Sequence, residues 1–223
     1  MVTSTGTCKK TSLKNFSRPR KGGIIAIDLR EDDKLVGVEI TAGEHDILLF
    51  SSAGKSIRFR ESDVRVVGRT AIGVRGIRLA DNDKVVSLIV AESNDPILTA
   101  TEKGYGKRTQ LDEYRTQARG GSGVISIKTS ERNGQVVGAI QVTDEDEMML
   151  ISNKGTLVRA RAVDVSIIGR NTQGVTLINI ADEEKLVSVA KIAESEEDDD
   201  VQSEDDSSSE VISKPKENSQ SEE

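Results

Sequence analysis

Residues 68–77 read Gly-Arg-Thr-Ala-Ile-Gly-Val-Arg-Gly-Ile, a basic turn punctuated by glycine that leads into an apolar run. The same plan recurs in residues 18–27, 117–127 and 169–178. Aligned on the glycine before the apolar run, the copies lie 50, 50 and 51 residues apart, at Gly23, Gly73, Gly123 and Gly174. A repeat of this length with several strands per unit is typical of a propeller or a solenoid.

The other parts of each unit keep the same phase, so the repeat extends beyond one short motif. A further strand is predicted to begin once per unit, at Leu35, Val85, Val136 and Leu186. A third apolar run follows in three of the units, at residues 47–50, 97–100 and 148–151. The hairpin turn next to these runs carries a glycine, at Gly6, Gly54, Gly104 and Gly155.

Two columns of cations share this period. A cation stands four residues after each hairpin-turn glycine, and we call these four the hairpin cations: Lys10, Arg58, Arg108 and Arg159. We call each basic turn with its apolar run a box, and the glycine before the run the box glycine. An arginine stands four residues before three of the box glycines, whereas Pro19 takes this place in the first box. We call these three the box arginines: Arg69, Arg119 and Arg170.

The composition predicts an all-β fold. Only 2% of the 223 residues are aromatic and there is no Trp, so Val, Ile and Leu must fill the core. Short aliphatic runs between Gly, Asn and Asp turns indicate strands, and no segment before residue 193 keeps a helical period for three turns. We therefore expect a β-propeller of four repeats over residues 1–192.

The net charge of -7 averages two unlike parts. Residues 193–223 hold 13 acidic and 2 basic residues, whereas residues 1–192 hold 25 acidic and 29 basic ones. The acidic segment contains few apolar residues, so we expect a disordered tail. This tail either keeps the protein solvated or acts as a polyanion that competes for the basic surface of residues 1–192. The excess of basic residues in residues 1–192 suggests contact with nucleic acid.

Cellular context follows from what the sequence lacks. The single cysteine, Cys8, cannot form an internal disulfide, which favours a reducing compartment. Residues 1–6 have no cationic stretch followed by an apolar one, and no run approaches about 18 apolar residues. We expect a soluble, cytoplasmic protein that contacts no membrane.

The first and last units are incomplete. Only residues 1–5 precede Gly6, where the other units have a full strand, and residues 186–192 are followed by no third or fourth strand. This pattern predicts either a truncated propeller or sheet edges without a partner, and such edges favour association.

With these boxes, and with the run from Gly104-Tyr105-Gly106-Lys107-Arg108 to Glu131-Arg132-Asn133-Gly134, the sequence resembles the C-terminal domain of the bacterial DNA gyrase A subunit. The resemblance covers residues 1 to about 192. It implies a six-bladed pinwheel propeller whose basic rim wraps duplex DNA and so supports negative supercoiling. Some members of the family also carry an acidic tail.

The sequence departs from the family pattern in two ways. The family's first-blade box, Gln-Arg-Arg-Gly-Gly-Arg-Gly, is approached only by residues 117–123, which have Ala118 and Ser122 in place of two cations. The cleavage domain with its nucleophilic tyrosine is also missing, and Tyr105 and Tyr114 lack its sequence context. We therefore expect no catalytic residue here, and a domain that wraps DNA poorly by itself.

The resemblance places the chain in an ATP-dependent type II topoisomerase whose catalytic parts are elsewhere. The implied partners are double-stranded DNA, the remainder of the gyrase A subunit, and the gyrase B subunit in a heterotetramer. ATP and magnesium are expected on other parts of that assembly, and no cofactor on this chain. The alternatives are a propeller that serves as a platform for protein interaction and the related domain of a topoisomerase IV-type subunit.

Recurrent cations suit the neutralisation of phosphates along a bent duplex. For each one the alternative is a solvated charge or a local salt bridge. The candidate DNA contacts are Lys9, Lys10, Arg18, Arg20, Lys21, Arg58, Arg60, Arg69, Arg75, Lys107, Arg108, Arg119, Arg159, Arg161 and Arg170. Gly23, Gly73, Gly123 and Gly174 are expected to be structural, because tight turns require them.

Other chemistry finds little support in the sequence. Single-stranded nucleic acid is bound mainly by stacking on aromatic rings, and the chain has five. His45 and Cys8 form no metal-binding spacing, and residues 144–147, Asp-Glu-Asp-Glu, read as a solvated turn rather than a magnesium site. Phosphate loops and nucleophile elbows are absent, and no metal site is predicted.

Overall fold

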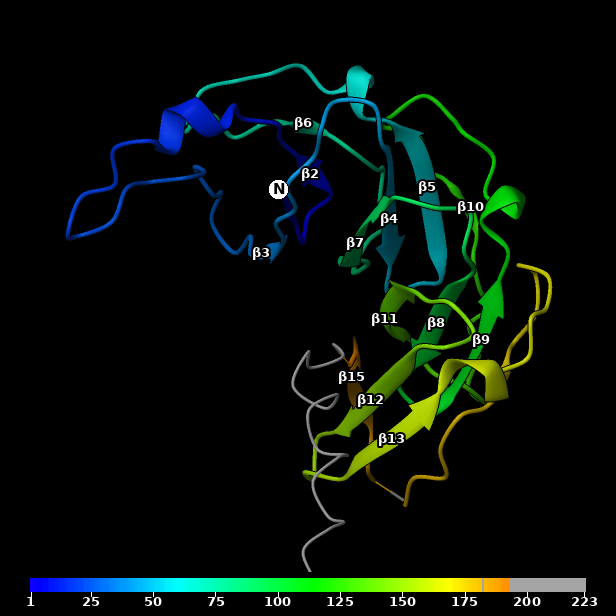
Figure 1. Ribbon diagram of the computed structural model, residues 1–223. Coiled ribbons are helices and arrows are strands. Elements are labelled where there is room, and N and C mark those ends of the chain that lie inside the picture. The colour runs from blue at the N-terminus through cyan, green and yellow to red at the C-terminus, as the bar shows by residue number, and fades with distance from the viewer. Residues whose placement is uncertain (182, 193–223) are drawn as a thin grey trace, which may run out of the picture. The chain divides into compact units, whose positions relative to one another are not determined.

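The structure, a computed structural model, describes residues 1–181 and 183–192 (Figure 1). The expected acidic tail, residues 193–223, lies outside the described residues. The described part is all-β, as predicted, with four antiparallel sheets that we call blades 1 to 4. The blades follow one another along an arc (Figure 1).

Each blade is built on a hairpin. The hairpins are β1 (Val2–Thr3) with β2 (Thr7–Cys8), β4 (Asp46–Ser51) with β5 (Lys55–Arg60), β8 (Ile97–Thr101) with β9 (Tyr105–Thr109), and β12 (Glu147–Ser152) with β13 (Leu157–Arg161). A 3-10 turn follows each hairpin: η1 (Leu13–Phe16), η2 (Glu61–Asp63), η3 (Leu111–Glu113) and η4 (Ala162–Asp164).

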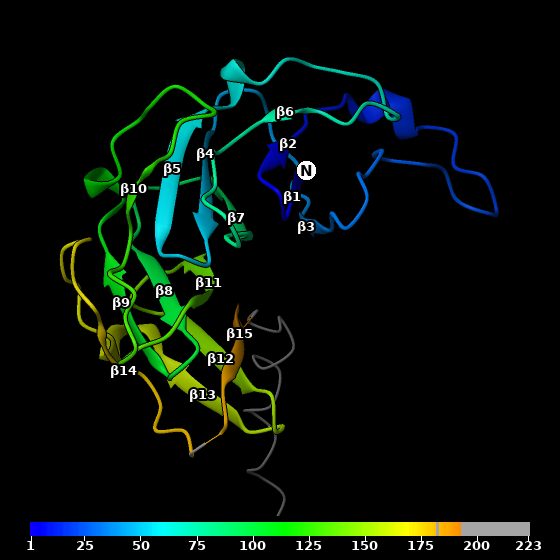
Figure 2. The same cartoon turned by 180° about the vertical axis from the view of Figure 1, so that it is seen from behind.

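An inner strand completes the other side of every hairpin. These strands begin where the repeat predicted them, at β3 (Leu35–Gly37), β7 (Val85–Ala91), β11 (Val136–Gln141) and β15 (Leu186–Lys191). The inner strands of neighbouring blades contact one another. Figure 2 shows β7 and β15 on the inner side of the arc and β10 and β14 on its outer side.

The outer strand of a blade comes from the following repeat. We call these outer strands box strands: β6 (Val74–Arg75) pairs with β2, β10 (Val124–Ile125) with β5, and β14 (Val175–Thr176) with β9. After each later hairpin, the chain therefore adds a box strand to the preceding blade and then returns to form the inner strand of a blade. This exchange ties successive repeats together through backbone hydrogen bonds.

One predicted strand is absent. Residues 24–27 share the apolar pattern of the box strands, yet they form no strand. The prediction was wrong because a box strand pairs with the hairpin before its own repeat, and the described residues contain no hairpin before β1–β2. At the other end of the arc, the outer edge of β13 has no partner strand among the described residues.

The hydrophobic cores lie between neighbouring blades. Alternate residues of β4 point to opposite faces, so that Ile47 and Leu49 pack against blade 1 whereas Leu48 and Phe50 pack against blade 3. The ring of Phe50 meets that of Tyr114 edge to face, with centroids 5.8 Å apart. Burial on both faces explains why these strands read as continuous apolar runs.

Blade 1 depends on a buried carboxylate at the turn before β3. Asp33 Oδ1 accepts hydrogen bonds from Ser4 Oγ at 2.8 Å and Thr5 N at 3.0 Å, and Oδ2 accepts one from Thr5 Oγ1 at 2.7 Å. Burial opposes ionisation, but the hydrogen bonds from Thr3, Thr5 and Ser4 prevail and lower the pKa of Asp33 to about 2.

We predict that Asp33→Asn lowers the free energy of unfolding by about 2 kcal/mol at pH 7, because a carboxylate with a depressed pKa stabilises the fold above its unfolded-state value. That contribution is lost as pH falls from about 4 to 2, so the gap between the two proteins should narrow over this range. Urea unfolding of both proteins at pH 7 and pH 3 measures this difference in the free energy of unfolding.

Asp32→Asn is the matched control. Asp32 is exposed, and its φ of 61° suits asparagine as well as aspartate, so this change should leave the free energy of unfolding nearly unchanged. A gap for Asp33→Asn that stays constant from pH 7 to pH 3 would contradict the assigned role of the Asp33 carboxylate.

Candidate nucleic-acid interface

Three of the four hairpin cations, Lys10, Arg58 and Arg108, bind backbone carbonyls of the next repeat. Arg58 Nη1 donates to the carbonyl of Leu111 at 2.9 Å and to that of Tyr114 at 3.2 Å, both at the 3-10 turn of the next repeat. Its Nε also donates to Asp46 Oδ2 at 2.7 Å. The guanidinium thus satisfies carbonyls that the short turn leaves without donors.

The same contact recurs in the other junctions. Arg108 Nε donates to the carbonyl of Val165 at 2.8 Å, and Lys10 Nζ to that of Glu61 at 3.1 Å. Arg108 is only 4% exposed. Arg159, the fourth hairpin cation, has no following repeat among the described residues, and its exposed side chain pairs with Glu147.

Two further candidates, Lys9 and Lys107, lie under the box turns. Lys107 Nζ donates to the carbonyls of Gly169 and Arg170, both at 2.6 Å, and the residue is 0% exposed. Burial lowers the pKa of Lys107 to about 8. Lys9 is also buried and donates to the carbonyls of Ala26 and Arg69. The structure therefore keeps Lys9, Lys107 and Arg108 away from the surface that the sequence assigned to them.

The box arginines hold the box strands in place. Arg119 Nη1 donates to the carbonyl of Arg75 at 2.8 Å and Arg170 Nη1 to that of Ile125 at 2.8 Å, in each case in the preceding repeat. Arg69 Nη1 makes the same contact with the carbonyl of Ile25 at 2.5 Å. These arginines are half-buried, and several of their N–H groups donate to backbone carbonyls instead of remaining free for another partner.

Seven candidates are exposed, and three of them are paired with carboxylates. Arg60 lies 3.2 Å from Asp46, Arg161 binds Asp164 through two hydrogen bonds of 3.0 and 2.9 Å, and Arg159 binds Glu147. The other four form no ion pair with any described residue: Arg18, Arg20, Lys21 and Arg75.

Sequence reasoning missed several exposed cations, among them four that lie close to the box strands and the 3-10 turns. Arg65 and Arg115 follow η2 and η3, and Arg78 and Lys128 follow β6 and β10. None forms an ion pair within the described part of the chain. Each pair lies 50 residues apart, so extending the column analysis beyond the turn glycines would have found them. Repeat 4 has Ser166 and Asn179 at these positions.

Exposed cations that pair with no described carboxylate occur at hairpin turns and before inner strands, as at Lys34 and Lys84, and also in a set on the box segments and after the 3-10 turns. We call this set the outer-edge cations: Arg18, Arg20, Lys21, Arg65, Arg75, Arg78, Arg115 and Lys128. Their charges face water rather than carboxylates or carbonyls, so they remain available to an anionic partner.

The four box glycines have the backbone conformation expected of them. Their φ angles are 77° at Gly23, 116° at Gly73, 71° at Gly123 and 82° at Gly174. An added Cβ at Gly123 would lie 2.3 Å from the carbonyl oxygen of Ser56, so the close approach of two chains as well as the φ angle requires glycine here.

The acidic turn and the lone histidine take part in local contacts. Asp144 binds Arg108, Asp146 lies 2.7 Å from Lys191 Nζ, and Glu147 binds Arg159. His45 Nδ1 lies 3.7 Å from Glu61. The described residues contain no group of three or more His, Cys, Asp or Glu side chains placed to hold a metal ion, and no helix among them is long and apolar enough to cross a membrane.

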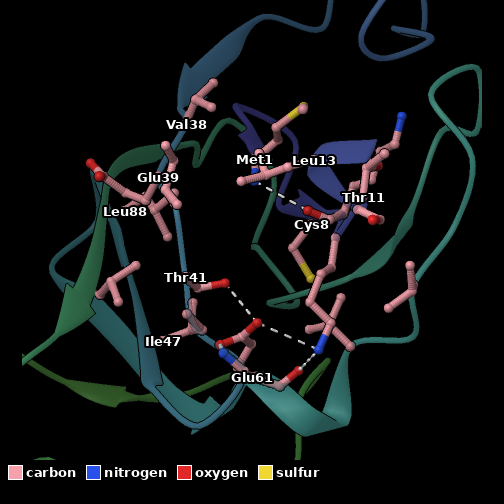
Figure 3. A pocket seen from close by; sticks show the side chains of 18 of the residues that line it. Met1, Cys8, Thr11, Leu13, Val38, Glu39, Thr41, Ile47, Glu61 and Leu88 are labelled. Atoms are coloured by element: carbon pink, nitrogen blue, oxygen red, sulfur yellow. Dashed lines mark hydrogen bonds and ion pairs between the residues drawn. The ribbon is translucent and has the colours of Figure 1, made fainter. Parts of the chain in front are cut away.

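A cavity of about 700 Å³ lies between blade 1 and blade 2 (Figure 3). Val38, Leu13 and Leu88 contribute to its apolar wall, and Thr41 donates a hydrogen bond of 2.6 Å to Glu61 at its polar end.

Comparison with known proteins agrees with this architecture. A family model described as the DNA gyrase C-terminal domain, a beta-propeller, matches residues 1–42, 45–92, 95–143 and 146–193. The chain belongs to this family. Its four matched stretches coincide with the four repeats, and each contributes one hairpin to the gyrase-type propeller.

Curated relatives and solved structures lead to the same family. The chain is 54% identical over 201 residues to the DNA gyrase A subunit of Salmonella typhimurium and 52% identical over 201 residues to that of Escherichia coli K12. Each match covers 90% of this chain and 23% of the relative, so the chain spans less than a quarter of their length.

Two solved domains resemble this structure closely. The C-terminal domain of DNA gyrase A has a TM-score of 0.78 at 30% identity, covering 86% of this chain and 64% of that one. The C-terminal domain of DNA topoisomerase IV has a TM-score of 0.81 at 29% identity, covering 86% and 60%. The fold is therefore shared by gyrase and topoisomerase IV.

For this gyrase-family domain, we predict that Arg58→Met lowers the free energy of unfolding by about 3 kcal/mol, because it leaves Asp46 Oδ2 and two backbone carbonyls without the donor that they share. Urea unfolding followed by circular dichroism measures this loss in the free energy of unfolding. Arg60→Met is the control, since Arg60 contacts the same carboxylate from an exposed position and should cost less than about 1 kcal/mol. Equal losses for the two variants would remove Arg58 from its role between blades.

Proposed function

We propose that residues 1–192 bind duplex DNA along the outer edge of the blades, without sequence preference, as the DNA-wrapping domain of a gyrase A subunit. The observation that carries this proposal is the set of outer-edge cations, which are exposed and form no ion pair with a described residue. Contacts between such cations and phosphates supply most sequence-independent affinity for DNA.

The arc of blades suits a bent duplex better than a straight one. Smooth bending of a short DNA segment by 40–90° costs on the order of 1–6 kcal/mol, which additional phosphate contacts can offset. Two columns of outer-edge cations recur in the second and third repeats, Arg65 with Arg115 and Arg78 with Lys128, and the first repeat adds Arg18, Arg20 and Lys21. Each of the first three repeats can therefore add contacts along the path of the duplex. The fourth repeat has neutral residues at these positions and would contribute less.

In this proposal the domain works in the cytoplasm with the remainder of the gyrase A subunit, together with the gyrase B subunit. DNA cleavage, ATP hydrolysis and magnesium binding belong to those parts, and the domain supports negative supercoiling by guiding the duplex. The relatives more than 50% identical are named as A subunits of DNA gyrase, which favours this function over that of a topoisomerase IV-type subunit.

We predict that the combined substitution of Arg65, Arg78, Arg115 and Lys128 by Gln flattens the slope of log affinity against log salt by about 3 to 4, since each phosphate contact contributes about 0.9. Fluorescence anisotropy with one labelled duplex, measured over a range of salt concentrations, gives the slope. A duplex of unrelated sequence should bind with the same affinity within about tenfold.

The matched control removes four positive charges from another part of the molecule. Lys34, Lys84, Lys154 and Lys185 are exposed and lie at hairpin turns or just before inner strands. Their combined substitution by Gln should leave the slope nearly unchanged. If the control flattens the slope as much as the test variant, net charge rather than the outer edge governs binding.

The second prediction concerns the acidic segment 193–223, whose net charge is -11. We expect its negative charge to compete with DNA for the outer-edge cations, because a polyanion on the same chain acts at a high effective concentration. Deleting it should tighten DNA binding at low salt, and the gain should shrink as the Debye length falls below about 10 Å. Equal affinities of the two proteins at low salt would show that the segment does not compete.

A further inference from the structure

The turn of the fourth box, residues 169–174, lies above a buried ammonium group, and we call it the fourth box turn. It leads into β14, which Figure 2 shows on the outer side of the arc. Lys107 Nζ donates to the carbonyls of Gly169 and Arg170, both at 2.6 Å, and the lysine is 0% exposed. Both carbonyls therefore point inward. Burial lowers the pKa of Lys107 to about 8, which leaves the group largely protonated at pH 7.

The position of these carbonyls also fixes two N–H groups. In a planar trans peptide unit the C=O and the N–H point in opposite directions. The unit that begins with the Gly169 carbonyl ends with the N–H of Arg170, and the next unit joins the Arg170 carbonyl to the N–H of Asn171. Both N–H groups therefore point outward, away from Lys107. Successive N–H groups above a buried positive charge favour an anion.

One side chain already uses this property of the turn. Glu113 Oε2 accepts a hydrogen bond of 3.1 Å from the N–H of Arg170. The same oxygen lies 3.7 Å from an added Cβ on Gly169, so the carboxylate lies against the turn. Glu113 belongs to η3 of the preceding repeat and is exposed. The N–H of Asn171 forms no hydrogen bond with a described residue, so the turn can donate to a further acceptor.

The corresponding turn of the third box differs in both features. Ile57 takes the place of Lys107 beneath it. Asp63, the counterpart of Glu113, is one methylene shorter, and its carboxylate forms no hydrogen bond or ion pair with a described residue. Its backbone carbonyl instead accepts a hydrogen bond of 3.0 Å from Arg119 Nε. The buried lysine and the bound carboxylate thus occur together at the fourth box turn.

We propose that the fourth box turn is a binding site for a backbone phosphate of duplex DNA, and that Glu113 occupies this site until DNA displaces its carboxylate. The inference rests on the proposed function, because it requires a duplex on the outer edge of the blades. The phosphate would accept hydrogen bonds from the N–H groups of Arg170 and Asn171, above the charge of Lys107. Hydrogen bonds from backbone N–H groups to an anion are strong, and the phosphate would engage two where Glu113 engages one.

Outer-edge cations lie beside the site. Arg115 follows Glu113 by two residues, and the N–H of Lys128 donates to the carbonyl of Thr172 at 2.8 Å. Both cations are exposed, so a duplex bound to them brings its phosphates close to the turn. The fourth repeat, which lacks cations at residues 166 and 179, would thus contribute to DNA binding through its backbone.

Fluorescence anisotropy with a labelled duplex and the full chain tests this inference. Glu113→Ala should tighten binding by about tenfold at low salt, because it frees a donor to a charged group. It should also steepen the slope of log affinity against log salt by about 1, the value of one further phosphate contact. Asp112→Ala is the matched control, because Asp112 is exposed, lies in the same 3-10 turn and forms no hydrogen bond or ion pair with a described residue. The control should tighten binding by no more than about twofold and leave the slope nearly unchanged.

A second substitution tests the buried ammonium group. Lys107→Ile places beneath the fourth box turn the side chain that Ile57 supplies beneath the third, so the fold has a precedent for it. In this background Glu113→Ala should no longer tighten DNA binding, because the carbonyls are no longer held inward. Thermal unfolding shows which variants fold. If Lys107→Ile does not fold, the comparison of Glu113→Ala with Asp112→Ala decides the question.

Three results would overturn the inference. If Glu113→Ala binds the duplex no more tightly than Asp112→Ala, Glu113 has a structural role alone, and the proposed function stands as long as the unmodified protein binds DNA. If the gain persists in folded Lys107→Ile, it reflects a general loss of negative charge instead of a site above the lysine. An unmodified protein that binds no duplex would overturn the proposed function and this inference together.

Discussion

The exchange of box strands between neighbouring repeats is the interaction on which the rest of this structure depends. A single hairpin with one inner strand cannot bury both of its faces, and a small isolated sheet is marginally stable in water. The box strand of a repeat pairs with the preceding blade, and these backbone hydrogen bonds fix the distance and orientation of the two neighbours. The apolar faces of adjacent blades can then pack into shared cores, with Leu48 and Phe50 on one side of β4 and Ile47 and Leu49 on the other.

Strand exchange also explains why so many cations serve the fold. The chain turns sharply after each hairpin and again at each box, and these turns leave carbonyl groups without helix or sheet partners. A buried carbonyl without a donor costs free energy, and arginine supplies several donors in a fixed planar arrangement. Arg58, Arg108 and Lys107 fill this need, each at a junction between repeats. Two carbonyls 2.6 Å from the Lys107 ammonium group offset part of its desolvation.

The surface charge that remains is what defines the proposed interface. Among the exposed cations that bind neither a carbonyl nor a carboxylate, those of the proposed interface lie on the box segments and on the residues that follow the 3-10 turns. These are also the segments that form the outer edge of the blades. The same construction therefore joins the repeats and presents some of their basic side chains to solvent.

The sequence by itself determined the all-β class, the four repeats and the positions of their turns, because spacing and glycine content report local backbone geometry directly. The phase of the repeat located every inner strand and two columns of glycines with positive φ, which include Gly73 and Gly54. It also placed Arg58 and Arg108 in one column, but a column says nothing about burial. Whether such a cation meets water or a carbonyl depends on a turn more than 50 residues away in the sequence.

Only the tertiary structure decided which hairpin each box strand joins, and hence that residues 24–27 form no strand despite their apolar pattern. A strand needs a partner for its backbone groups, and a pattern of side chains cannot show whether that partner is present. For the same reason the sequence could not separate Arg75, which is exposed on a box strand, from Lys107, which is buried beneath a box turn. Local periodicity fixes the elements, whereas pairing between repeats fixes which of their side chains remain at the surface.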